Sequence, residues 1–68
     1  MLDPTTTPEE AVRMAIEREK KAHEFYIQAA KIAKYPGTQQ MFEELAKEEL
    51  THIQRLEDEL NKEYMKDV

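Results

Sequence analysis

Apolar and small side chains recur every three or four positions through the first half of the chain. This spacing places them on one face of an α-helix. They are Val12, Ile16, Tyr26, Ala30 and Ala33, with a flanking row of Ala15, Ala22, Phe25 and Ala29. Thr7, Pro8 and Glu10 come just before them, as an N-cap, a first helical residue and the last member of a capping box. The pattern predicts a helix over residues 8–34, after a flexible lead at residues 1–6.

A second helical stripe follows, after a short segment of turn-forming residues. The stripe comprises Phe42, Leu45, Glu49, His52, Leu56 and Leu60, with Ile53 beside it. In the segment before it, Pro36 disfavours helical geometry at the preceding residue. Gly37 can take positive φ, and Thr38 can cap a following helix. We therefore predict a turn at residues 35–38 and a second helix over residues 39–63.

Two helices joined by so short a turn run antiparallel, as a helical hairpin. Their apolar stripes and the flanking row together form a band too wide for two helices to cover. A hairpin of this kind is expected to dimerise, so that two copies share one core as a four-helix bundle. The predicted fold class is all-α, with residues 1–68 as a single domain. Larger assemblies of such dimers are compatible with the pattern.

Four ionisable residues interrupt the apolar stripes at one level of the expected hairpin. Glu49 and His52 lie three residues apart, so they share a face of the second helix. In an antiparallel arrangement Glu19 faces His52, and His23 faces Glu49, with apolar layers on both sides. Each of these groups would cost several kcal/mol to bury unpaired. A bound cation is the expected compensation.

The donor set indicates which metals would suit such a site. Carboxylates with imidazole suit iron, manganese or zinc, and a carboxylate-rich set favours iron or manganese. One chain supplies few donors, whereas Glu19, Glu49 and His52 doubled across a two-fold axis can hold two ions. We predict two iron ions per homodimer, with manganese or zinc as alternatives. Glu19 and Glu49 would bridge the ions, and His52 would bind one ion through a single nitrogen.

Plainer interpretations of the same residues stay open. Glu49 and His52 can form an ordinary solvated pair, and Glu19 can pair with a neighbouring lysine or with His23. His23 can ligate the metal, contact a ligand from outside, or be a polar core residue, and Tyr26 can be a core aromatic. The polar layer can also fix the register of a non-catalytic oligomerisation module. A non-redox zinc or calcium site is a further alternative.

Composition narrows the classes of function. A chain of 68 residues is a small domain, and such domains often need a metal or a partner for stability. The absence of cysteine excludes disulfides, iron–sulfur clusters and thiolate zinc sites. A net charge of -5 argues against nucleic-acid binding. No apolar run approaches the roughly 18 residues of a membrane span and no signal sequence is evident, so we expect a cytoplasmic location.

Two motifs together resemble the rubrerythrin branch of the ferritin-like superfamily. They are Glu19-x-x-Ala22-x-x-Phe25-Tyr26-x-x-Ala29-Ala30 and Phe42-x-x-Leu45-Ala46-x-Glu48-Glu49-x-x-His52-x-x-x-Leu56. In that family the Glu of the first helix and the Glu-x-x-His carry a di-iron centre. The resemblance therefore implies Glu19, Glu49 and His52 as ligands in a ferritin-like bundle. It also implies that Tyr26 lies near the centre.

The resemblance further implies chemistry with oxygen or peroxide. Oxidation of ferrous iron is the expected reaction, and reduction of peroxide with an external electron donor is the alternative. The usual family domain has four helices in one chain, whereas two are expected here. This resembles the two-helix encapsulated ferritins, which complete the site across a subunit interface and work with a storage shell inside a protein compartment. Rubrerythrin proper also has a cysteine-bound iron, which a chain without cysteine cannot hold.

Overall fold

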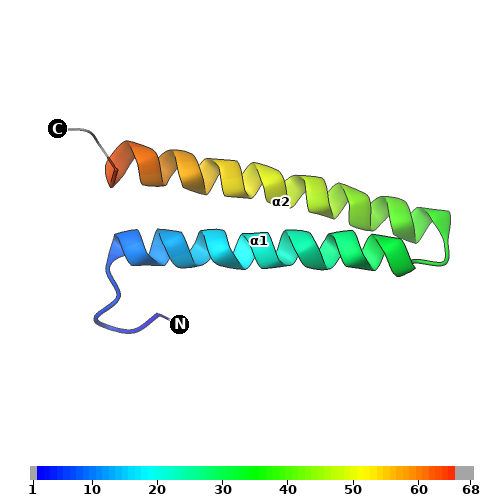
Figure 1. Ribbon diagram of the computed structural model, residues 1–68, viewed down its shortest axis with the longest axis horizontal. Coiled ribbons are helices and arrows are strands. Elements are labelled where there is room, and N and C mark those ends of the chain that lie inside the picture. Colours follow the sequence, from blue (N-terminus) through cyan, green and yellow to red (C-terminus); the bar gives the residue numbers. More distant parts are fainter. Residues whose placement is uncertain (1, 66–68) are drawn as a thin grey trace.

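The computed structural model describes residues 2–65 and contains two long helices there. Helix α1 spans Pro8–Ile32 and helix α2 spans Pro36–Glu63. The helices lie side by side and antiparallel, so that α1 begins at the same end of the hairpin where α2 ends (Figure 1). No strand occurs in the described residues. The predicted all-α hairpin is confirmed.

The start of α1 is set by the predicted capping box. The Thr7 hydroxyl accepts a hydrogen bond from the backbone N–H of Glu10, and the Glu10 carboxylate accepts one from the backbone N–H of Thr7. Two N–H groups that have no partner inside the helix are thereby satisfied. Pro8 at the first helical position loses nothing by lacking an N–H.

The turn differs from the predicted one. Helix α1 ends at Ile32 instead of residue 34, and α2 begins at Pro36 instead of residue 39. Tyr35, rather than Thr38, is the N-cap residue, and its backbone is extended. The expected positive φ at Gly37 is wrong, because no described residue has one. The physical reason is that a proline favours an extended residue before it and a helix after it, so Pro36 starts α2.

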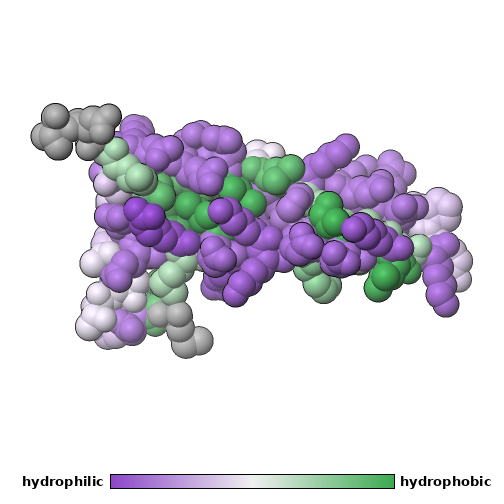
Figure 2. Space-filling model, in the orientation of Figure 1, coloured by the Kyte–Doolittle hydropathy of each residue, from purple (hydrophilic) through white to green (hydrophobic). Residues whose placement is uncertain are grey.

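The buried seam between the helices is narrow. Its members are Ile16, Ala30, Ala46, Ile53 and Leu60. Ile53 belongs to this seam, whereas Leu56 of the predicted stripe is only half-buried. On the face drawn in Figure 2, hydrophobic side chains are open to view between rows of hydrophilic ones. A two-helix layer therefore leaves part of its apolar surface uncovered.

The overall dimensions agree with a single layer of two helices. The principal extents are 50 × 26 × 11 Å. The radius of gyration is 15.2 Å, whereas a compact domain of this length would have about 11 Å. Among residues 2–65, no helix has the length and apolar character needed to cross a membrane.

The described part of the N-terminal lead is organised by Asp3. The Asp3 carboxylate accepts hydrogen bonds from the backbone N–H of Thr5 and from the hydroxyls of Thr5 and Thr6. The Thr6 backbone N–H donates to the Asp3 carbonyl. Residues 3–6 of the predicted flexible lead thus form a hydrogen-bonded turn, and residue 1 of that lead lies outside the described residues. Beyond the turn, Leu2 lines a groove on α1 and α2, together with Ala11, Met14, Ala15 and Leu56.

Candidate metal centre

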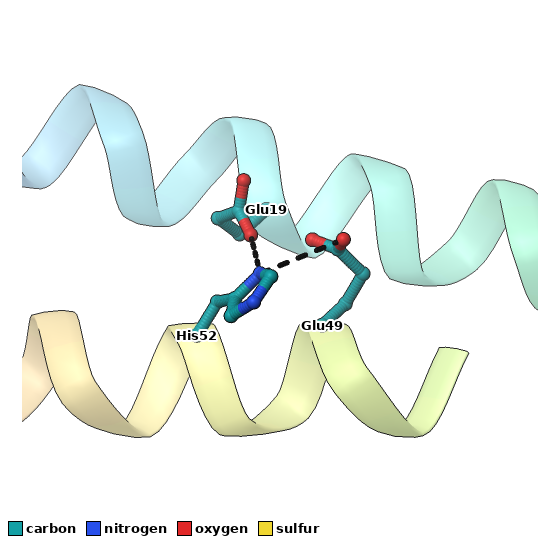
Figure 3. A group of neighbouring side chains, drawn as sticks. All are labelled: Glu19, Glu49 and His52. Carbon is teal, nitrogen blue, oxygen red and sulfur yellow. Dashed lines mark hydrogen bonds and ion pairs between the residues drawn. The ribbon is translucent and has the colours of Figure 1, made fainter. Parts of the chain in front are cut away.

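The three predicted ligands come from the middle of the two helices. Glu19 lies on α1, and Glu49 and His52 lie on successive turns of α2. A separation of three residues brings Glu49 and His52 to the same side of the helix. Figure 3 shows the Glu19 side chain pointing toward α2 and the other two pointing toward α1.

The side chains meet closely enough to hold one ion. One ligand atom from each of Glu19, Glu49 and His52 lies within 4.8 Å of the others. The Nδ1 atom of His52 is 2.9 Å from Oε2 of Glu19 and 3.7 Å from Oε1 of Glu49. The predicted pairing of Glu19 with His52 is therefore present. The structure brings together all three predicted ligands, and their binding of a metal stays a prediction.

The centre is more open than the sequence pattern indicated. No polar or charged residue is buried among the described residues. The exposed fraction of the side chain is 13% for Glu49, 29% for Glu19 and 52% for His52. The expected buried polar layer is wrong for a single chain, because the seam passes beside these residues. The centre instead lies at the edge of the seam, on a face that two helices cannot close.

One carboxylate oxygen of the centre lacks a hydrogen-bond partner. Oε2 of Glu49 is buried and has no hydrogen-bond partner in the described residues. A buried carboxylate oxygen without a partner is costly. A cation held by the carboxylates and the imidazole would satisfy this atom, and that donor set suits iron or manganese. The residues present thus fit the metal that was predicted for them.

The two carboxylates influence each other's ionisation. Hydrogen bonding to Glu19, followed by burial and the negative charge of Glu19, raises the pKa of Glu49. The pKa of Glu19 is lowered, first by its hydrogen bond with Glu49 and then by His52. Glu49 therefore keeps a proton more readily than an ordinary glutamate, and Glu19 loses one more readily. A cation at this position would favour the ionised form of both carboxylates.

The two residues expected near the ligands lie on the turn side of the centre. The Nδ1–H of His23 donates a 2.9 Å hydrogen bond to the backbone carbonyl of Ala46. The predicted pairing of His23 with Glu49 is thus replaced by a bond to the backbone one turn away. The Tyr26 ring stacks on Phe42 at a centroid distance of 6.1 Å. Tyr26 therefore has a packing role between the helices.

Two kinds of group near the centre were not predicted from the sequence. The Ala46 carbonyl is one, because every residue has such a group and no sequence pattern distinguishes it. The basic side chains beside the centre are the other: Arg18 lines the hollow next to Glu19, and Arg55 lines a hollow with Glu19 and His52. Their position on the helices could have been read from helical spacing, but charged residues at such positions are common.

Comparison with known proteins identifies the family. Neither the curated proteins nor the solved structures gave a significant match. The family model described as Rubrerythrin matches residues 10–68, which is most of the chain and includes all of α2 and all but the first two residues of α1. The expectation drawn from the two motifs is thereby confirmed: the chain belongs to the rubrerythrin family of iron-binding, ferritin-like proteins.

Proposed function

We propose that this protein oxidises ferrous iron with oxygen or peroxide at a centre completed by a second copy of the chain. The observation that carries the proposal is the convergence of Glu19, Glu49 and His52 on an open face, with one Glu49 oxygen buried and unpartnered. Membership of the rubrerythrin family supports iron as the metal.

The open face also supports a dimer. Half-buried small residues of α1 continue the ligand face away from the seam; they are Ala11, Ala15, Ala22 and Ala29. Small side chains allow another helix to approach closely. A second hairpin packed on this face would cover the exposed His52 side chain and place a second set of ligands opposite the first. Four carboxylates and two imidazoles would then surround two ions.

Each residue of the centre has a separate part in this reaction. Glu19 and Glu49 bind the ferrous substrate and balance the charge that it gains on oxidation. A cation favours the ionised form of both carboxylates, so a proton held on Glu49 leaves when the cation binds. His52 supplies a neutral nitrogen that favours iron over calcium or magnesium. Each ferrous ion gives up one electron, and the oxidant accepts these electrons together with protons.

The test is an anaerobic titration of the metal-free protein with ferrous iron, followed by exposure to air or hydrogen peroxide. Iron binding, consumption of the oxidant and oligomeric mass are measured on the same samples. We expect saturation near two irons per dimer and oxidation faster than in buffer. Glu49→Ala should remove both, with iron affinity lowered about 100-fold or more.

The neighbouring exposed Glu48 supplies a matched control. Glu48→Ala removes the same charge from the next position of α2 and should leave binding and oxidation unchanged. A dimer that binds no iron would contradict the proposal and favour a helical oligomerisation module. Iron oxidised only by peroxide, with electrons then restored by an added reductant, would favour the peroxide-reductase alternative.

A further inference from the structure

We propose that His23 is a positioning residue, whose hydrogen bond to the Ala46 carbonyl sets the axial register of α2 against α1 at the metal centre. The inference rests on the proposed function for its effect on metal binding. The bond itself is independent of that function. Its length is 2.9 Å, and it joins the two helices across the part-buried interior of the hairpin.

The position of this bond relates it directly to the ligands. His23 is one helical turn from Glu19 on α1, and Ala46 is three residues from Glu49 on α2. Ala46 is only 2% exposed, so its carbonyl faces a part of the seam with little access to water. A shift of α2 along α1 by one turn, about 5.4 Å, would break the bond and would move Glu49 away from Glu19.

Apolar contacts alone specify this register weakly. The seam consists of Ile, Ala and Leu side chains, which can pack in more than one axial arrangement at similar cost. A hydrogen bond requires a particular distance and direction, so it discriminates among such arrangements. Losing it would leave the Nδ1–H of His23 without its present partner.

The other polar bond at this level cannot serve the same purpose once a cation is bound. The bond between His52 and Glu19 uses His52 Nδ1, the nitrogen that faces both carboxylates. A cation held there takes the place of that hydrogen bond. The bond between His23 and Ala46 uses neither a ligand side chain nor a ligand atom. It can therefore hold the helices in register in both the metal-free and the metal-loaded protein.

The test compares two substitutions of His23 in the full chain. His23→Leu removes the donor and keeps an apolar side chain of moderate size, whereas His23→Asn keeps an N–H close to the position of Nδ1. Cobalt(II) is the probe, because its absorption reports coordination geometry as well as affinity. We expect His23→Leu to bind cobalt(II) about 10-fold more weakly with an altered spectrum. His23→Asn should have a cobalt(II) affinity and an absorption spectrum closer to those of the wild type.

A control separates positioning from general stability. Leu60→Ala removes a buried side chain of the same seam, far along α2 from the centre. It should lower the unfolding temperature and leave the cobalt(II) spectrum unchanged. Wild-type affinity and spectrum in folded His23→Leu would overturn the proposal. If His23→Leu does not fold, His23→Asn is compared with His23→Gln, whose N–H lies further from the backbone. Equal cobalt(II) affinity and spectra in these two variants would then overturn the proposal.

A measurement without metal distinguishes failure of this inference from failure of the proposed function. In the metal-free protein, the proton on His23 should be found on Nδ1 by nitrogen-detected NMR, since a carbonyl can only accept. Contacts between the Tyr26 and Phe42 rings should be weakened in His23→Leu. A His23 ring with Nδ1 unprotonated would overturn the inference even if iron binds. If the wild type binds no metal but has a protonated Nδ1 on His23, and the ring contacts are weakened in His23→Leu, only the proposed function would be refuted.

Discussion

At the scale of single residues, the ionisation of Glu19 and that of Glu49 depend on each other, because the two carboxyl groups are neighbours. Glu49 is the most enclosed of the three, and the ionised Glu19 beside it raises the pKa of its carboxyl group. The folded protein therefore binds more protons at Glu49 than the unfolded chain does. For Glu19 the sign is opposite, because its pKa is lowered in the folded protein. Protons and a metal ion thus compete for the same carboxylate oxygens.

The pH dependence of stability follows from these signs. In metal-free protein, stability due to Glu49 is lost as pH rises from its ordinary value of 4.5 through its raised pKa. Stability due to Glu19 is lost as pH falls below 4.5 through its lowered pKa. We predict that Glu49→Gln removes the loss of stability with rising pH, because the amide can donate a hydrogen bond to Glu19 and does not titrate. Its free energy of unfolding near neutral pH should rise by on the order of 1 kcal/mol.

Urea unfolding of both proteins in chelator, between about pH 5 and about pH 8, tests this prediction. Glu48→Gln is the control, since it removes a neighbouring charge outside the centre. Parallel pH profiles for the wild type and Glu49→Gln would show that Glu49 has no raised pKa.

At the scale of the elements, the turn shows how one proline can be interpreted in two ways. Pro36 ends a helical pattern when it is considered with the residues before it, and it starts a helix when considered with those after it. The structure adopts the second arrangement, with Tyr35 extended and Gly37 inside the first turn of α2. Gly37 then needs no positive φ, and a Cβ atom at this position would meet nothing within 4 Å.

Gly37→Ala should therefore stabilise the protein. Alanine loses less backbone entropy on folding than glycine and has the higher helix propensity, worth about 0.5–1 kcal/mol. The free energy of unfolding in urea measures the change. A loss of stability would mean that Gly37 adopts positive φ in solution, as the turn-based prediction assumed.

At the scale of the whole molecule, the hairpin is a single layer with an incomplete core. Among residues 2–65, five residues are buried and no side chain is fully buried. The face beside the seam combines a groove lined by Leu2, Ala15 and Leu56 with the open side of the ligand cluster. Burial of this face and completion of the centre would be achieved by the same contact. Dimerisation and metal binding are accordingly expected to be linked.

Ala15→Arg is predicted to separate the two copies. The long charged side chain fits a half-exposed position of the single hairpin but obstructs a second hairpin on the same face. We expect dimer affinity to fall on the order of tenfold to a hundredfold, with iron binding weakened in parallel. Sedimentation equilibrium with and without metal measures both. Gln28→Arg adds the same charge at an exposed position of α1 and should leave the dimer intact; equal dimerisation of all three proteins would exclude this face as the interface.

The sequence by itself determined the two helices, the hairpin and the identity of the three clustered side chains. Helical periodicity, the Thr7 capping box and the three-residue spacing of Glu49 and His52 depend on local geometry, which recurs wherever the same residues form a helix. The short turn makes the helices antiparallel, and this arrangement places Glu19 opposite His52 along the hairpin. These features can be recognised without knowing how the helices are offset or rotated.

Only the tertiary structure decided how open the centre is and what His23 contacts. Exposure of His52 depends on the rotation of each helix about its axis, which the burial of Ile53 rather than Leu56 reveals. The partner of His23 depends on the axial offset of the helices to within a fraction of a turn, because the acceptor is a backbone carbonyl. Such rotations and offsets depend on the packing and the hydrogen bonds of both helices together, so a one-dimensional pattern of residue types does not specify them.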